Sequence, residues 1–178
     1  MNLKTTFIGL ELKSPIIAGS CGLTADINKL QEIANQGAGA VILKSLFEEQ
    51  INREAAECIS GDSYPEEADY IQNYVRAHTV QHYIDLVKQA KAKLDIPVIA
   101  SVNCLRDGEW ISFAAELEQA GADALELNIF ILPTDEFMES AEIENMYFNI
   151  VKHVKNVVNI PIIVKISRYF ISQISFGF

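Results

Sequence analysis

Residues 120–128, Ala-Gly-Ala-Asp-Ala-Leu-Glu-Leu-Asn, give the clearest indication of the architecture of this protein. Gly121 ends a helical pattern, and an apolar strand pattern that finishes on Asn128 begins a few residues later, as a short loop from helix to strand requires. Residues 36–44, Gln-Gly-Ala-Gly-Ala-Val-Ile-Leu-Lys, repeat the arrangement, and aligning the first glycine of each stretch places Lys44 on Asn128. Such a repeat indicates parallel βα units whose strands end on a polar residue.

The same pattern continues on both sides of this stretch. Short apolar runs introduced by proline or glycine alternate with segments of helical period, which predicts a parallel sheet covered by helices. Aligning residues 96–97 with residues 160–161, both Ile-Pro, places Ser101 on Lys165. The expected strands are residues 15–19, 40–44, 97–103, 124–128 and 161–166, and a hairpin is expected over residues 2–13.

We interpret the chain as an α/β protein, a partial (β/α)8 TIM barrel that holds the first five β/α strands and is preceded by a short N-terminal hairpin. A whole barrel of this kind needs about 250 residues, whereas the chain has 178. We therefore expect a single domain over residues 1–178 that is the N-terminal portion of a longer barrel, truncated at its C-terminus. The alternative is a five-stranded doubly wound domain that is complete as it stands.

Composition narrows the range of partners. The net charge is −10 and the isoelectric point is about 4.7, with no cluster of Lys and Arg, so we expect neither nucleic acid nor an anionic membrane as a partner. The three cysteines show no metal-ligand spacing and their odd number suits no disulfide framework, so we expect no metal site. No leader or membrane-spanning stretch is recognisable, and these features favour a cytoplasmic location.

Two lysines at equivalent strand ends are the most informative candidate site residues. Lys44 and Lys165 each finish an apolar strand, and we expect neither ammonium to be a solvated surface charge, because parallel strands are buried on both faces. Each lysine could bind a ligand, or it could form a structural ion pair with a carboxylate such as Glu126.

Other polar residues near strand ends could contribute to the same site. Asn103 and Asn128 could offer amide groups to a planar heterocycle, although a single asparagine there is often a turn former. Residues 19–22, Gly-Ser-Cys-Gly, follow the first strand, and they either allow a flat or anionic ligand to approach the backbone or form an ordinary tight βα turn. Between Lys44 and a helix expected to start near residue 79, we predict a long acidic loop of the kind that forms lids or binding segments.

Five segments taken in chain order resemble the dihydroorotate dehydrogenase family, most closely its soluble class 1 branch or a dehydrogenase-like relative. The resemblance runs through nearly the whole chain, and each segment lies at an expected strand. The segments are Ser-Pro-Ile-Ile-Ala-Gly-Ser (14–20), Gly-Ala-Gly-Ala-Val-Ile-Leu-Lys-Ser (37–45), Pro-Val-Ile-Ala-Ser (97–101), residues 120–128 and Pro-Ile-Ile-Val-Lys (161–165).

The resemblance implies an FMN-dependent TIM barrel that oxidises dihydroorotate to orotate in pyrimidine biosynthesis. It also implies a small pyrimidine-like substrate and leaves a homodimer open. The residues that would contact FMN are Ala18, Gly19, Ser20, Lys44, Ser45, Ser101, Asn128 and Lys165. Those that would contact the substrate are Lys44, Asn103 and Asn128.

The chain departs from the family where the catalytic base is expected. After the Glu-Leu-Asn motif the family carries a cysteine or serine that removes a substrate proton, but here the matching position falls near Ile131, an aliphatic residue. Thr134 is the nearest hydroxyl, so the base is unknown and the chemistry is expected to be impaired or altered. Two other functions stay open: an aldolase-like barrel with Lys165 or Lys44 as the Schiff-base nucleophile, and a non-enzymatic binding module.

Overall fold

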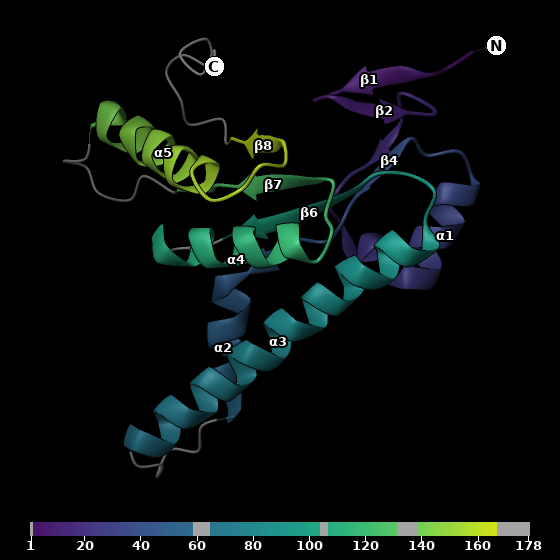
Figure 1. Cartoon of the computed structure of the whole chain (residues 1–178). Coiled ribbons are helices and arrows are strands. Elements are labelled where there is room, and N and C mark those ends of the chain that lie inside the picture. Colours follow the sequence, from purple (N-terminus) through teal and green to yellow (C-terminus); the bar gives the residue numbers. More distant parts are fainter. Residues whose placement is uncertain (1, 59–64, 104–106, 132–138, 167–178) are drawn as a thin grey trace.

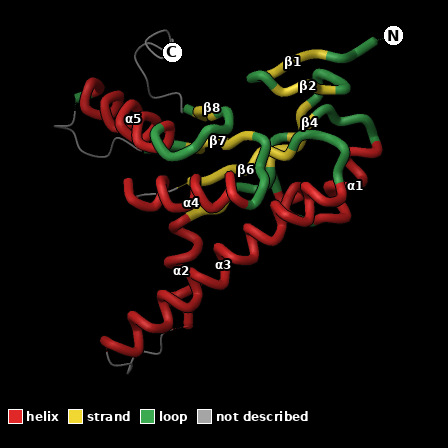
Figure 2. The backbone as a smooth tube through the Cα atoms, viewed as in Figure 1, coloured by secondary structure: helices red, strands yellow, loops and turns green. Residues whose placement is uncertain are grey.

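The computed structural model describes residues 2–58, 65–103, 107–131 and 139–166, and the side chains of 65–68, 107 and 109 are not described. Its main sheet is parallel, and its strands are neighbours in the order in which they occur along the chain (Figures 1 and 2). That order is β3 (Ile17–Ala18), β4 (Ala40–Ile42), β6 (Val98–Asn103), β7 (Ala124–Asn128) and β8 (Ile162–Lys165).

This strand order confirms the predicted partial barrel. A doubly wound sheet reverses direction at a switch point, whereas here each strand lies beside the next one along the chain. All five predicted strands are present, although several are shorter than predicted. The sequence did not predict the two-residue strand β5 (Leu46–Phe47), which continues the pairing along β6 beyond the end of β4.

The helices form a layer on the outer face of the sheet. They are α1 (Ile27–Asn35), α3 (Pro65–Lys93), α4 (Asp107–Gln119) and α5 (Ser140–Lys155), with α2 (Glu48–Cys58) packed on α3 and a 3-10 turn, η1 (Gly22–Ala25), before α1. Because alternate residues of a strand face opposite sides, Val41, Val98 and Leu125 point into this layer and are fully buried. No helix among the described residues is long and apolar enough to cross a membrane.

A second, smaller core lies on the concave face of the sheet. Ala40, Ile99 and Ala124 are fully buried there, and Leu12 from the N-terminal hairpin packs against them. The hairpin pairs β1 (Thr5–Phe7) with β2 (Leu10–Leu12), as the sequence predicted. It therefore covers the end of the concave face at which the strands begin.

Two glycines explain the repeated connections between helix and strand. Gly37 and Gly121 have φ angles of +98° and +97°, a conformation that strains any residue with a Cβ. Each follows a helix and allows the chain to turn back into β4 or β7. Gly39 meets a different constraint, because a Cβ there would collide with the backbone carbonyl of Ser14.

The prediction of a long acidic loop after Lys44 is wrong. Apart from residues 59–64, which lie outside the described ranges, this segment forms β5, α2 and the first half of α3. Ile51 and Ala55 lie one helical turn apart and are 2% and 1% exposed, so α2 has a buried apolar face, and its acidic residues lie mainly on the other faces. Together α2 and α3 form an arm that projects from the sheet (Figure 1).

Candidate active site

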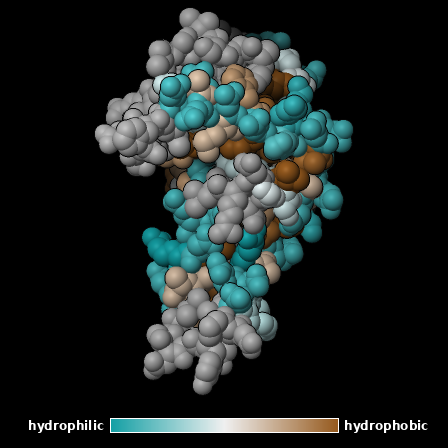
Figure 3. Space-filling model, turned by 90° about the vertical axis from the view of Figure 1, so that its left-hand side faces the viewer, coloured by the Kyte–Doolittle hydropathy of each residue, from teal (hydrophilic) through white to brown (hydrophobic). Residues whose placement is uncertain are grey.

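Polar side chains occupy the concave face where the strands end. Ser101 lies two residues after Ile99, and Glu126 lies two residues after Ala124, so both face the same side as the small core. Lys165 stands in the same relation to Ile163. The concave face therefore has an apolar layer where the strands begin and a polar layer where they end. Figure 3 views the molecule from the side where the strands end and shows hydrophobic side chains surrounded by hydrophilic ones.

Glu126 is the centre of the polar layer. Its Oε1 atom accepts hydrogen bonds from Ser101 Oγ at 2.7 Å and from Lys165 Nζ at 2.9 Å. The Glu126 side chain is 6% exposed, and that of Lys165 is 44% exposed. A buried carboxylate requires such partners, because removing it from water is costly. The ion pair with Glu126 that the sequence offered as one alternative is thus confirmed for Lys165.

A chain of serine hydroxyls leads away from Glu126 across the sheet. Ser101 Oγ lies 2.7 Å from Ser45 Oγ, and Ser45 Oγ lies 3.1 Å from Ser20 Oγ. The Ser45 backbone N–H also donates to Ser20 Oγ at 2.9 Å. The structure therefore brings together four of the predicted site residues, Ser20, Ser45, Ser101 and Lys165.

Tyr83 of α3 holds the backbone of Ser101. Its hydroxyl accepts a hydrogen bond from the Ser101 N–H at 2.9 Å and donates one to the Ser101 carbonyl at 3.0 Å. Ser101 needs these partners because β4 ends at Ile42 and β5 begins at Leu46, which leaves a gap in the sheet beside it. Burial is the main cause that raises the pKa of Tyr83, so the hydroxyl stays protonated and can donate.

The two asparagines play different parts. Asn103 is buried, and its side-chain amide donates to the backbone carbonyl of Asn128 at 2.7 Å. This hydrogen bond joins the end of β6 to the end of β7. It also uses an N–H donor of the Asn103 side chain, which the family resemblance assigned to the substrate. Asn128 is partly exposed at the mouth of the concave face.

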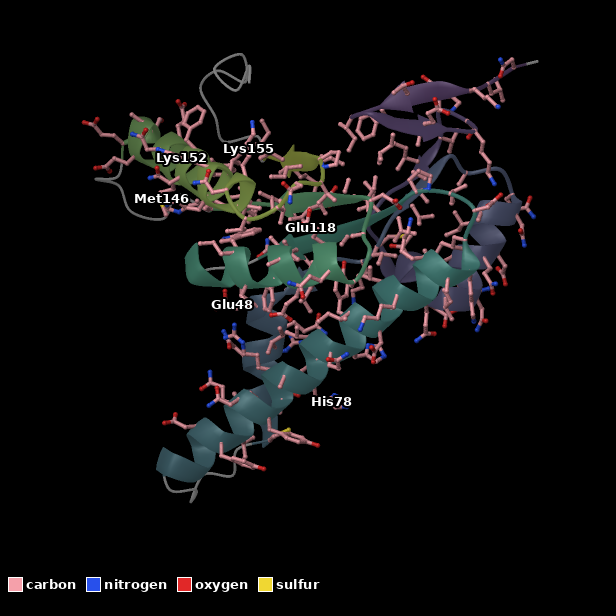
Figure 4. All side chains as sticks on the ribbon, viewed as in Figure 1. Glu48, His78, Glu118, Met146, Lys152 and Lys155 are labelled. Carbon is pink, nitrogen blue, oxygen red and sulfur yellow. The ribbon has the colours of Figure 1, made fainter. Side chains whose placement is uncertain are left out.

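Lys44 does not share the surroundings of Lys165. It is exposed, so the prediction that it would not be a solvated charge is wrong. The reason is that the chain leaves the sheet after β4, so Lys44 does not lie within a strand. It lines a cavity of about 340 Å³ between the α2–α3 arm and β5. Ser45, Tyr83, His82 and His78, which projects from α3 in Figure 4, line the same cavity.

Some predicted residues lie away from the serine chain. Ala18 packs with the outer core, and Gly19 is exposed with open space around it. Ile131 is partly buried against the outer core, and its N–H donates to the Tyr147 hydroxyl at 3.4 Å. Thr134 lies outside the described residues.

Sequence reasoning missed two functional candidates. Glu126 was considered only as an ion-pair partner, although a carboxylate flanked by leucines in a buried strand is itself a signal of a built polar site. Tyr83 gave no signal, because a tyrosine on the apolar stripe of a helix is indistinguishable from an ordinary core residue. Within the described ranges, no group of three or more His, Cys, Asp or Glu side chains could hold a metal ion.

Two curated proteins are similar to this chain. One is the catalytic subunit of dihydroorotate dehydrogenase B (NAD(+)) from Thermoplasma acidophilum, 25% identical over 169 residues. The other is the protein of the same name from Thermoplasma volcanium, 26% identical over 177 residues. In both comparisons the match covers 93% of this chain and 54% of the relative, so the chain spans about half the length of these relatives.

Among solved structures, an IMP dehydrogenase/GMP reductase-like protein from Corynebacterium glutamicum is similar to this chain. It is 11% identical, and the match covers 93% of this chain and 43% of that protein with a TM-score of 0.49. The family model described as dihydroorotate dehydrogenase matches residues 2–175, which is nearly the whole chain. The chain therefore belongs to the dihydroorotate dehydrogenase family.

Proposed function

We propose that the chain forms part of an FMN-dependent oxidoreductase that oxidises a C–C single bond of a small pyrimidine-like acid, as in the conversion of dihydroorotate to orotate. The observation that carries the proposal is the convergence of Ser101 and Lys165 on Glu126 at the end of the concave face. This end of a parallel barrel is where ligands bind. The family to which the chain belongs generally depends on FMN.

The donors at this end suit a flavin. An ammonium group has three N–H donors, and Glu126 occupies one of those of Lys165, whose side chain is 44% exposed. A cation in this position favours negative charge on a ligand ring. Gly19 adds an exposed backbone with nothing within 4 Å of where a Cβ would stand, so a flat ring could approach closely. When bound, FMN would supply the hydride acceptor.

The substrate would lie beside Asn128, at the mouth of the concave face. Lys44 lines the cavity on the other side of the sheet, so we assign it no contact with the substrate. Asn128 would contribute its amide to the ring. Ile131 packs against the outer core, so this side chain would not serve as the base, and we propose that the substrate differs from dihydroorotate or that its oxidation is slow.

The structure offers little support for the two alternative functions. A Schiff-base lysine acts as a nucleophile in a desolvated pocket, whereas Lys44 is exposed and Lys165 is half exposed and bonded to a carboxylate. The doubly wound binding module requires a reversal of strand order that the sheet does not have.

Titration with FMN, followed by flavin fluorescence, tests the proposal. Lys165→Ala should weaken FMN binding about tenfold, because a hydrogen bond to a charged group contributes about 1.5–3 kcal/mol and a tenfold change is 1.4 kcal/mol. Lys155→Ala removes an exposed lysine from α5 and should leave the affinity unchanged. An FMN affinity that Lys165→Ala leaves unchanged, or an equal loss in both variants, would contradict the proposal.

A further inference from the structure

The gap between β4 and β5 allows a polar connection to pass through the sheet. Ser45 lies in this gap, lines the cavity beside the α2–α3 arm and is 6% exposed. On its other side, its hydroxyl contacts Ser101 on the concave face at 2.7 Å. If β4 continued without interruption, backbone hydrogen bonds between β4 and β6 would occupy this position. Ser45 therefore stands between the outer cavity and the hydroxyl of Ser101 on the concave face.

The hydroxyl protons in this chain have a defined direction. Ser101 has a single hydroxyl proton and donates it to Glu126 Oε1, so in its contact with Ser45 it must be the acceptor. Ser45 is then the donor to Ser101 and must accept from Ser20. All the hydroxyls therefore point toward Glu126. A head-to-tail arrangement of this kind is what proton transfer along a hydrogen-bonded chain requires.

The two ends of the chain differ in their contact with water. Ser101 is fully buried and the Glu126 side chain is 6% exposed. The cavity at the Ser45 end is lined by His78 and His82, both exposed, and by Lys44. The charged or titratable groups that face Glu126 itself are Lys165 and Tyr83.

We propose that Ser45 and Ser101 form a proton route between the cavity beside the α2–α3 arm and Glu126. A hydronium ion in the cavity gives its proton to Ser45 Oγ, the Ser45 hydroxyl proton moves to Ser101 Oγ, and the Ser101 hydroxyl proton moves to Glu126 Oε1. Each serine oxygen forms one O–H bond and loses one. The net change converts hydronium to water and the carboxylate to a neutral acid, and the reverse sequence returns the proton to water.

The route reaches Glu126 from the side opposite to the proposed ligand site. The Glu126 side chain is only 6% exposed on the concave face, and a ligand covering that face would leave the cavity open. The use of the route in turnover rests on the proposed function. Its existence does not, so it is testable without cofactor or substrate.

The test measures hydroxyl exchange at single serines in an equal mixture of H2O and D2O. With 13C-labelled Cβ atoms, a serine whose hydroxyl exchanges slowly gives two resonances, and one that exchanges quickly gives a single averaged resonance. Ser101 should give a single resonance although it is buried. Ser14 is the internal control, because it is 6% exposed, donates to the Gly37 carbonyl at 2.7 Å and lies outside the chain of serines. Ser14 should give two resonances.

Variants locate the route. Ser45→Ala should split the Ser101 resonance into two, and Ser45→Thr, which keeps the hydroxyl, should leave it single. Ser20→Ala should also leave it single, because protons enter at the cavity. Two resonances for Ser101 in the unaltered chain, or a single one in Ser45→Ala, would overturn the proposal, and splitting by Ser20→Ala would overturn entry through the cavity. If Ser45→Ala does not fold, Ser45→Val takes its place, because it has the shape of Ser45→Thr without the hydroxyl and should also split the Ser101 resonance.

Discussion

Two strands of similar apolar sequence lead to Lys44 and to Lys165, Val-Ile-Leu-Lys (41–44) and Ile-Ile-Val-Lys (162–165), yet their lysines have different surroundings. Lys165 is paired across the sheet with Asn128 on β7, which places its ammonium 2.9 Å from Glu126. Lys44 follows a strand that has already ended, and it is exposed beside a cavity. Whether the lysine still lies in the sheet beside a carboxylate, and not the sequence of its strand, decides whether the charge is paired.

Removing the Tyr83 hydroxyl should produce the largest loss of stability. This hydroxyl fills the gap between β4 and β5, which is also the place where the chain carries Lys44 out of the sheet. In Tyr83→Phe the buried N–H and carbonyl of Ser101 lose their partner, and each unsatisfied group costs about 1–3 kcal/mol. We expect the free energy of unfolding to fall by about 3 kcal/mol, measured by urea denaturation. Tyr74→Phe on the exposed part of α3 is the matched control and should change stability little. Similar losses in both variants would show that the hydroxyl does not support the sheet.

Removing each lysine in turn tests the comparison directly. Lys165→Ala leaves the buried Glu126 without its cation, and we expect a loss of about 2 kcal/mol, less than for a fully buried pair because Lys165 is half exposed. Lys44→Ala should change the free energy of unfolding by less than about 0.5 kcal/mol. Urea denaturation of both variants under one set of conditions measures the difference. Equal losses would mean that Lys44 has an energetic role that its surroundings do not show.

Alkaline pH should produce the smallest effect. The pKa of Tyr83 is raised in the folded chain above its ordinary value of 10.0, mainly by burial. Its contribution to stability is therefore fully present below pH 10 and is lost as the pH rises above it, because the unfolded chain ionises first. Between pH 10 and pH 11 the unaltered chain should lose about 1 kcal/mol more than Tyr83→Phe, since one proton corresponds to about 1.4 kcal/mol per pH unit. If the free energy of unfolding fell equally with pH in the unaltered chain and in Tyr83→Phe, ionisation of Tyr83 would not be the cause.

The strands and their order were predictable because each signal is local. Proline or glycine introduces each of the five predicted strands of the main sheet, and glycine ends the helices before β4 and β7. The pairing of Lys165 with Glu126 could be offered as an alternative, since both residues end apolar strands. Which lysine is paired could not be predicted, because that depends on where β4 stops.

Helix α2 and the first half of α3 were missed for a related reason. The acidic residues of α2 accompany a narrow apolar stripe, of which Ile51 and Ala55 are the most buried members. A stripe that packs mainly on one neighbouring helix is too narrow to give a strong helical period in the sequence. The role of Tyr83 was not predictable either, because the gap that its hydroxyl fills exists only once the sheet has formed.

The strand β8 has consequences for the behaviour of the chain in solution. Within the described residues it pairs only with β7, so the other side of its backbone offers a row of hydrogen-bonding groups without a strand partner. Ile162, Ile163 and Val164 on this strand are only partly buried. Apolar edges of this kind promote association between copies of a chain. Samples should therefore remain monodisperse only when dilute, and the net charge of −10 slows this association most at low ionic strength.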